Sequence, residues 1–366
     1  MVTSRDHLSR NPTDFPLPDK PNMLRNSLLP LLLFPTISAL ASTYIFRHVH
    51  ESGLGNALGG LCSPQSDLLE NPYRMSYVTG IDALDKALCS LVTFFQFAIQ
   101  PDEDEPLPRL FASYLLGNLL PLLAIIAVEM QRYRLSARRA GRWIGNPLLS
   151  SFSLLGTIYQ NITIAITIPI YFTMAILSGS TPGQKDMLTK QHVEAIMFGL
   201  VMGYFIPSVG MLVLNDPHVT AIWQFFPLIV SMFKHMHLAV RRPSKHGVRN
   251  AHGAVRMLYL TLGIVASSMH AALVWPKIAS LDIDSLKLLF VPARLYGYSW
   301  ATMAGQTMEL LQWDGVLCFI ATMFWTFWVV PGRWREVKVT AWYIVAVPLV
   351  GPGAAVAGVG LWRETS

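Results

Sequence analysis

The residues best suited to chemistry in this chain are Glu309 and Asp314, two carboxyl groups inside an apolar region at residues 296–330. The region is predicted to form two apolar segments that meet at an acidic hinge, Asp314, and the second segment, residues 316–330, carries no charge. Carboxyl groups are costly to hold in such surroundings, so they indicate a function. Residues at steps of three and four along the first segment are predicted to share a helix face with Glu309: Thr302, Gly305, Gln306 and Trp313.

The chemistry that these residues predict is acid catalysis in an apolar pocket. A carboxyl group in apolar surroundings favours its protonated form, and such an acid can give a proton to an epoxide oxygen or to an alkene. Aromatic rings beside it can stabilise the resulting carbocation by cation–π attraction. The alternative is a helix-end pair of charges at the membrane surface, with Trp313 as an interfacial anchor. The residues predicted to shape the pocket and bind its substrate are Trp313, Gln306, Trp300, Tyr298 and Tyr296.

Glu129 and Asp216 are further candidates for a catalytic acid, and each also has a structural interpretation. Glu129 stands three residues before Arg132, a spacing at which two side chains on a helix can form an ion pair. Asp216 lies in the sequence Asn-Asp-Pro-His at 215–218, where it favours a turn and can cap the following helix. Both interpretations stay open for each residue.

Other polar residues stand in apolar stretches. His270 is a candidate for a catalytic base or a substrate contact, and the alternative is an interhelical histidine held by hydrogen bonds. Asp82 and Asp85 share a helix face and can hold magnesium, but Lys86 can pair with Asp82, which favours a helix start. Tyr159 and the two residues after it form a polar belt. No motif for a nucleotide, a metal or an organic cofactor accompanies these residues, so we expect no cofactor.

The composition indicates an integral membrane protein. Of the 366 residues, 52% are hydrophobic and only 14% are charged, whereas a soluble domain carries about a quarter charged residues. The basic residues cluster between apolar blocks, so the net charge of +6 is typical of membrane-facing loops rather than of a nucleic-acid-binding surface. Cys62, Cys89 and Cys318 have neither metal-ligand spacing nor the even count of a disulfide framework, and we interpret them as packing residues.

The chain is predicted to be an all-α polytopic bundle of about eight to ten transmembrane helices, given that a span needs about 20 apolar residues. We expect one transmembrane domain, residues 22–362, between a disordered polar leader at 1–21 and a short tail at 363–366. The stretch 147–177 is over-long and is expected either to tilt or to kink, with Pro169 as a candidate position for a kink. The predicted spans are 24–46, 80–100 (which can also be re-entrant), 110–130, 147–177, 195–214, 219–240, 257–275, 286–311, 316–330 and 339–362.

The basic segments of the chain conflict with this set of spans. They are residues 132–142 with five arginines, 241–256 with five Arg or Lys, and 333–338 with three. If every predicted span crosses the membrane, the first and third segments face one side and the second faces the other. Positively charged loops share the cytoplasmic side, so at least one predicted span does not cross. We suspect either 286–311 or the pair within 195–240.

Three short motifs resemble a known group of proteins. They are Tyr-Val-Thr-Gly-Ile-Asp-Ala-Leu-Asp at 77–85 leading into Leu-Val-Thr-Phe-Phe, Val-Glu at 128–129 before a basic loop, and Leu-Gln-Trp-Asp at 311–314. Over residues 22–362 the chain resembles the membrane-integral terpene cyclases of fungal meroterpenoid biosynthetic clusters. The resemblance implies cyclisation of the prenyl chain of a farnesylated aromatic compound, started by protonation of a terminal epoxide or alkene without a metal. It implies Glu129 and Asp314 as acids, and Glu309 is added on physical grounds alone.

The leading hypothesis is therefore a terpene cyclase in an internal membrane such as the endoplasmic reticulum. Its partners are the lipid bilayer and a lipophilic prenylated substrate, with no nucleic acid, and its oligomeric state is left open. A proton-coupled transporter or exporter of a lipophilic metabolite is one rival, in which the same acids couple to protons, although no repeated halves are evident. Another intramembrane lipid isomerase or transferase is a second rival, and it would depend more on His270.

Overall fold

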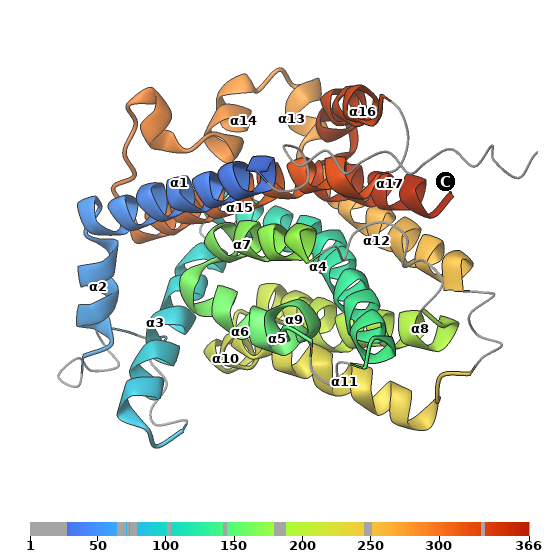
Figure 1. Cartoon of the computed structure of the whole chain (residues 1–366). Coiled ribbons are helices and arrows are strands. Elements are labelled where there is room, and N and C mark those ends of the chain that lie inside the picture. The colour runs from blue at the N-terminus through green and yellow to red at the C-terminus, as the bar shows by residue number, and fades with distance from the viewer. Residues whose placement is uncertain are drawn as a thin grey trace, which may run out of the picture.

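The computed structural model describes residues 28–63, 71, 73, 79–100, 104–141, 145–178, 188–244, 251–330 and 334–365. All regular secondary structure in these residues is helical, which confirms the all-α prediction (Figure 1). The predicted leader at 1–21 lies outside the described residues.

Five long helical segments within the described residues are apolar enough to cross a membrane, which confirms a polytopic membrane bundle. In α4, 83% of the apolar stretch is buried, against 33% in α1, so α4 is an inner helix and α1 lies at the periphery of the bundle. The predicted total of eight to ten spans depends on shorter helices and stays a prediction. The five segments are α1 (Leu29–Glu51), α4 (Leu107–Arg139), α8 to α9 (Lys190–Leu214), α12 to α13 (Ala251–Ala279) and α15 (Met303–Val329).

Shorter helices complete the bundle and connect the long ones. Two of the long segments are themselves divided: α8 (Lys190–Leu200), the π-helix η3 (Val201–Phe205) and α9 (Ile206–Leu214) form one, and α12 (Ala251–Leu273) and α13 (Trp275–Ala279) form the other. The remaining elements are α2 (Leu54–Leu61), α3 (Asp82–Ile99), α5 (Pro147–Ser150), α6 (Phe152–Ile162), α7 (Ile164–Leu177), α10 (Pro217–Gln224), α11 (Phe226–Val240), α14 (Ile283–Phe290), the 3-10 helix η5 (Ala293–Tyr296), α16 (Arg335–Val350) and α17 (Pro352–Thr365).

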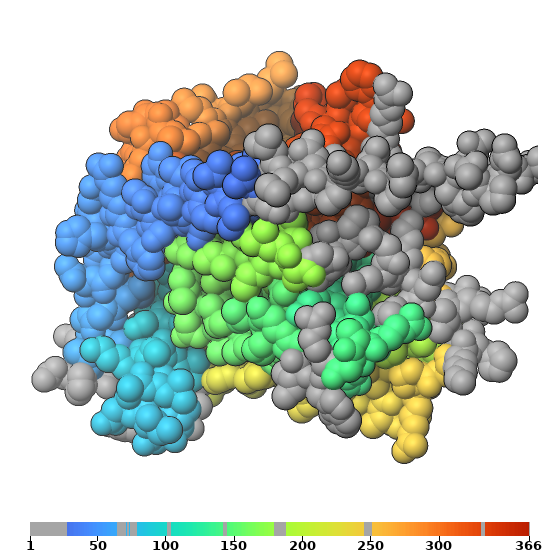
Figure 2. Space-filling view, viewed as in Figure 1, coloured from blue at the N-terminus to red at the C-terminus, as the bar shows by residue number. Residues whose placement is uncertain are grey.

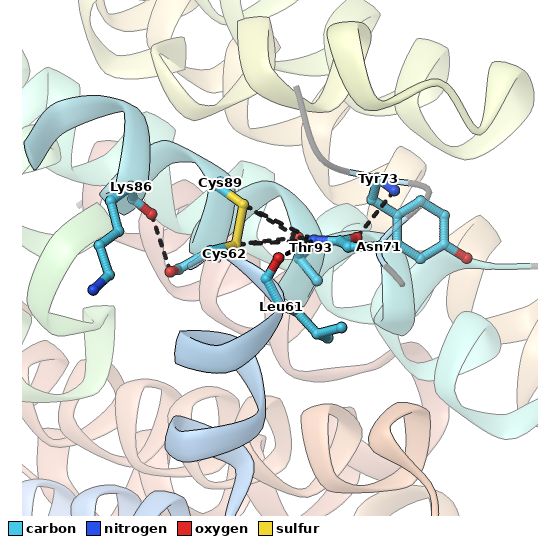
Figure 3. The surroundings of a disulfide bond; sticks show 8 residues. Leu61, Cys62, Asn71, Tyr73, Lys86, Cys89 and Thr93 are labelled. Atoms are coloured by element: carbon cyan, nitrogen blue, oxygen red, sulfur yellow. Dashed lines mark hydrogen bonds between the residues drawn. A yellow bond between two sulfur atoms is a disulfide. The ribbon is translucent and has the colours of Figure 1, made fainter. Parts of the chain in front are cut away.

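A disulfide bond joins α2 to α3 (Figure 3). It links Cys62, just after α2, to Cys89 within α3, so the interpretation of these two cysteines as packing residues is wrong. The Asn71 side chain donates a hydrogen bond to Thr93 beside the bridge, at 3.1 Å. At the start of α3, Asp85 accepts hydrogen bonds from the backbone just before the helix, which agrees with a helix-start role rather than a magnesium site.

Residues 147–177 fold back on themselves instead of forming one kinked helix. The chain breaks at Thr163, whose φ of +102° separates α6 from α7. α7 then returns toward the start of α5. The prediction of one continuous helix over 147–177 is therefore wrong, and Pro169 lies within α7. After the break, Asp314 of α15 accepts a hydrogen bond from the amide of Ala165, in the first turn of α7.

Residues 339–362, predicted as a single span, belong to a second hairpin that is made by α16 and α17. Its turn is Gly351, with a φ of +86°. A Cβ atom there would lie 2.9 Å from His270 Nδ1 and 3.0 Å from Asn118 Oδ1, so the site requires glycine. Asn118 Oδ1 also accepts a hydrogen bond from the first turn of α17 at 3.0 Å. The predicted tail at 363–366 instead continues α17 through residue 365.

The predicted helix at 286–311 is also wrong. The chain there forms α14, η5 and an irregular stretch, because Pro292 lacks the amide needed to continue α14. A new helix, α15, then starts at Thr302, whose hydroxyl accepts a hydrogen bond from the Gly305 amide at 3.0 Å. α15 continues through Asp314 without a break, so the predicted hinge at that residue does not exist.

The three basic segments approach one another at one end of the molecule, which we call the basic end. His252, in the second basic segment, lies 3.2 Å from the Glu364 carboxylate near the end of α17. Arg132 pairs with Glu364 near the end of α17 at 2.7 Å. Near the start of α16, Lys338 shares a surface groove with the end of α17.

This arrangement bears on the topological conflict. Residues 80–100 are not among the five long apolar segments, and residues 147–177 and 286–311 do not form single helices. If these three stretches do not cross, two, four and six of the ten predicted spans precede the three basic segments, and all three segments are expected on one side, opposite the stretch that follows α1. The suspicion about 286–311 is confirmed, whereas α8 to α9 within 195–240 is long enough to cross. Figure 1 shows α2 and α3 at the left and the end of α17 at the right, and Figure 2 shows α1 lying across this face between them.

Candidate active site

A cavity of about 60 Å³ lies beside Asp314, between α15 and the helices that pack on it. Its lining consists mostly of leucine side chains from α4 and of aromatic rings, so it is apolar. Among the lining residues the one carboxyl group is that of Asp314. The aromatic and polar side chains of the lining are Phe95, Tyr159, Gln160, Tyr204, Trp223, Phe226 and Asp314.

Asp314 is held in place by α7. Its Oδ1 atom accepts a hydrogen bond from the Ala165 amide at 2.7 Å. The first amides of a helix have no partner within that helix, so Asp314 caps α7 from a neighbouring helix. Leu311, one turn earlier on α15, lines the same cavity, which shows that α15 turns this face toward it.

This geometry suits an acid that must give up a proton and leave a stable carboxylate. The apolar walls favour the protonated carboxyl group. After proton transfer, the Ala165 amide and the positive end of the α7 dipole stabilise the negative charge. Donors that are already in place before the reaction are a main source of such stabilisation in enzymes.

Aromatic rings form much of the cavity wall. The ring of Trp223 lies 5.3 Å from that of Phe226 and 4.9 Å from that of Phe95, and Tyr204 lies 4.9 Å from Phe226, measured between ring centroids. The faces of such rings attract cations. The cavity therefore combines an acid with surfaces that can stabilise a carbocation.

Glu309 lies on a different face of α15 and does not line the cavity. Asp314 comes five positions after Glu309, so the two side chains point in directions about 140° apart around the helix axis. Its Oε1 atom accepts a hydrogen bond from the Arg294 amide at 3.2 Å, and its Oε2 atom lies 3.8 Å from His48 Nδ1. Only 1% of Glu309 is exposed. The carboxyl group thus ties α15 to α1 and to η5.

The residues predicted to bind substrate, apart from His270, gather on the Glu309 side, and none of them lines the cavity. Trp313 stacks on Tyr44 of α1, with 4.3 Å between ring centroids. The Gln306 side-chain amide donates to the Trp300 carbonyl at 3.4 Å. Tyr296 and Tyr298 stack on each other at 6.3 Å. The structure therefore separates the predicted pocket into two places, one around Asp314 and one around Glu309.

Glu129 belongs to a buried network of ion pairs toward the basic end. Its Oε1 atom lies 2.6 Å from Arg132 Nη1 and 2.7 Å from Arg363 Nη1, and Arg363 also donates to its Oε2 atom at 3.1 Å. Arg132 binds Glu364 as well. Both carboxylate oxygens of Glu129 are thus engaged in joining α4 to α17, and Glu129 does not line the cavity.

Asp216 and His270 also lie outside the cavity lining. Asp216 caps α10, because its Oδ1 atom accepts a hydrogen bond from the His218 amide at 2.6 Å. This hydrogen bond holds the pKa of Asp216 below its usual value. His270 has both ring nitrogens engaged: Nδ1 lies 3.0 Å from the Tyr114 hydroxyl, and Nε2 lies 3.0 Å from the Pro348 carbonyl. Its contacts are those of an interhelical histidine.

Sequence reasoning missed most of the cavity wall. Phe95, Tyr204, Trp223 and Phe226 come from separate elements and form no local pattern. Tyr159 did give a signal, because it begins a polar belt in an apolar stretch.

Comparisons with known proteins agree over most of the chain. The family model described as the CtvD domain matches residues 30–365. Terpene cyclase ctvD of Aspergillus terreus (strain NIH 2624 / FGSC A1156) is 24% identical over 295 residues, which cover 71% of this chain and 78% of that protein. Terpene cyclase ascI of Acremonium egyptiacum is 24% identical over 273 residues, which cover 68% of this chain and 66% of that protein. No solved structure matches the chain.

Proposed function

The chain belongs to the CtvD domain family, and we propose that it is a membrane-bound terpene cyclase in which Asp314 is the catalytic acid. Its substrate is a farnesylated aromatic (meroterpenoid) compound that is cyclised without a metal. Two curated relatives are terpene cyclases by name. The observation that carries the assignment to Asp314 is a carboxyl group in an apolar, aromatic cavity, supported by the Ala165 amide.

In this mechanism the protonated carboxyl group of Asp314 transfers its proton to the terminal epoxide oxygen or alkene carbon of the prenyl chain. The epoxide C–O bond or the alkene π bond breaks, and a carbocation forms. Internal alkenes of the chain then attack it in turn and form the ring bonds, and a weaker base removes a proton from the last cation. The rings of Trp223, Phe226 and Tyr204 stabilise the charge as it moves.

The size of the cavity sets a condition on this mechanism. At about 60 Å³ it is smaller than ligand pockets, which usually measure about 300–1,000 Å³. A prenyl chain therefore has to displace lining side chains as it enters. The side chains to be displaced include leucines of α4, whereas Asp314 is held by its hydrogen bond to the Ala165 amide.

The test uses microsomes from a host that expresses the chain, supplied with a farnesylated phenol or its terminal epoxide and excess chelator. The products are analysed by liquid chromatography coupled to mass spectrometry. Cyclisation gives a product whose mass is unchanged and whose chromatographic retention time differs. We expect Asp314→Asn to lower the rate by about 10²- to 10⁴-fold, the usual contribution of a general acid. Glu309→Gln is the matched control on the same helix. Full activity of Asp314→Asn would show that another group supplies the proton.

We also propose an orientation in the endoplasmic reticulum membrane. Positively charged loops face the cytosol, which puts the basic end on that side. Disulfide bonds persist in oxidising compartments such as the lumen of the endoplasmic reticulum, and the Cys62–Cys89 bond lies in the part of the molecule opposite the end of α17 (Figure 1). The charge pattern and the disulfide thus support the same orientation.

This orientation can be tested by counting free thiols. Membranes are denatured in a polyethylene-glycol maleimide, with and without prior reduction, and the gel shift counts the labelled cysteines. The chain has three cysteines, of which Cys318 is free, so we expect one label before reduction and three after it. Three labels without reduction would contradict a luminal position for α2 and α3.

A further inference from the structure

The polar side chains that line the Asp314 cavity differ in whether they already have partners. The Tyr204 hydroxyl donates a hydrogen bond to the Leu116 carbonyl at 2.9 Å. The indole nitrogen of Trp223 donates to the Ser208 hydroxyl at 2.8 Å. The Tyr159 hydroxyl, in contrast, has no hydrogen-bond partner in the described part of the chain.

Tyr159 belongs to the buried core, with only 4% of its surface exposed. Its ring packs against that of Phe226 at 6.0 Å between centroids. On its own helix, a Cβ atom added to Gly156 would lie 3.4 Å from the Tyr159 hydroxyl oxygen and 2.2 Å from Pro227 of α11. α6 and α11 are thus in close contact beside the hydroxyl, while Tyr159 itself lines the cavity.

An unpaired hydroxyl in an apolar site is unusual, since the great majority of buried polar groups form hydrogen bonds. A phenol hydroxyl can donate to an ether, epoxide or hydroxyl oxygen, whereas a hydrocarbon chain offers it no acceptor. A site built for such a hydrogen bond rejects ligands that lack the matching group. The missing partner of Tyr159 therefore points to a ligand that carries oxygen.

We propose that the Tyr159 hydroxyl donates a hydrogen bond to an oxygen atom of the bound substrate and so fixes which part of the prenyl chain lies beside Asp314. The inference rests on the proposed cyclase function and adds a specificity-determining residue to it. Tyr204 lines the same cavity but has its hydroxyl bonded to the backbone. It provides a matched control for the effect of the hydroxyl on stability.

The first experiment measures binding to the purified full-length chain in detergent by tryptophan fluorescence. The probes are a farnesylated phenol and its terminal epoxide. We expect Tyr159→Phe to weaken binding of the epoxide by about 2- to 10-fold, the value of one ordinary hydrogen bond. Tyr343→Phe is expected to leave binding unchanged, because Tyr343 is buried outside the cavity lining and its hydroxyl donates to Thr326. A loss for the epoxide alone places the hydroxyl at the reacting end of the substrate, and a loss for both probes places it at the aromatic end. Unchanged binding by Tyr159→Phe overturns the proposal.

The second experiment does not depend on any ligand. Without substrate, Tyr159→Phe removes an unpaired hydroxyl, so its melting temperature is expected to equal or exceed that of the wild type. Tyr204→Phe removes a bonded one and is expected to melt lower. If Tyr159→Phe melts as low as Tyr204→Phe, the hydroxyl has a structural partner and the proposal is wrong.

The proposed function can fail separately from this inference. Asp314→Asn is expected to bind both probes and convert neither. If it converts them at the wild-type rate, the acid is misassigned while the binding difference at Tyr159 still stands. If Asp314→Asn is inactive and Tyr159→Phe binds and cyclises as the wild type does, the function stands and the role of Tyr159 falls.

Discussion

Replacing Glu129 by glutamine separates a structural role for this residue from a catalytic one. The network contains two arginines, Arg132 and Arg363, and two glutamates, Glu129 and Glu364. The side chains of Arg132 and Glu364 are 1% and 0% exposed. Glu129→Gln removes one negative charge, so the two guanidinium groups of the network are balanced by the Glu364 carboxylate alone. Removal of one partner from a buried ion pair usually costs about 3–5 kcal/mol, so we expect a loss of stability of that size.

The assay is thermal or denaturant-induced unfolding of the purified chain in detergent. Arg47→Gln is the control, because its ion pair with Glu51 is exposed, with side-chain exposures of 66% and 42%. Such pairs contribute little, so Arg47→Gln is expected to unfold as the wild type does. Adding Arg363→Met to Glu129→Gln restores the balance of charge, and the double variant is expected to recover part of the lost stability.

One result would refute this reasoning. If Glu129→Gln unfolds at the wild-type midpoint and yet abolishes cyclisation, the ion pairs are not what Glu129 provides. Glu129 would then be the catalytic acid, as the family resemblance implies, and the assignment to Asp314 would have to be withdrawn.

Two further predictions concern turns and caps. Gly351→Ala is expected to cost about 1–3 kcal/mol of stability from backbone strain alone, and overlap of the new Cβ atom with Asn118 and His270 adds to this cost. Gly59→Ala is the control, because a Cβ atom there would meet no atom within 4 Å. It is expected to unfold at or above the wild-type midpoint. Asp216→Ala is expected to cost about 1 kcal/mol, the usual value of a helix cap. Because the folded pKa of Asp216 lies below its usual value, its carboxylate stabilises the fold above about pH 4. The difference between Asp216→Ala and the wild type should stay constant near neutral pH and shrink as pH falls below that value. Unfolding curves check these predictions, and those of Asp216→Ala are recorded at several pH values. Equal stability of Gly351→Ala and Gly59→Ala would contradict the first prediction. A stability difference between Asp216→Ala and the wild type that grows as pH falls would contradict the second.

The membrane class and most long helices could be predicted from the sequence, because apolar blocks of about 20 residues leave little choice of structure. The two hairpin turns could not. Asp314 lies 149 residues from Ala165, whose backbone amide donates a hydrogen bond to it. Asn118 lies 235 residues from the amide of Gly353 that it caps. Local patterns do not contain such partners, so each hairpin was predicted as one continuous span.

The candidate site was predicted in part, for a similar reason. Glu309 and Asp314 both stand in apolar surroundings on one helix, and the sequence alone could not decide between them. The helices that face α15 give the two acids different surroundings, which support the proposal for Asp314: α1 and η5 bring His48 and Arg294 to Glu309, whereas α7 brings the Ala165 amide to Asp314 beside a cavity.

The two hairpins also bear on why residue 314 is an aspartate. At the turn of α16 and α17, a neutral amide, Asn118, accepts the hydrogen bond from the first turn of the second helix at 3.0 Å. At the turn of α6 and α7, Asp314 does the same at 2.7 Å. An asparagine would cap α7 with a similar carbonyl oxygen and at a lower cost of burial than an ionisable group. Capping alone therefore does not explain a carboxyl group at residue 314. The proposed role, a proton donor to a ligand in the adjacent cavity, requires one, so under this proposal Asp314→Asn is expected to fold and yet not to catalyse.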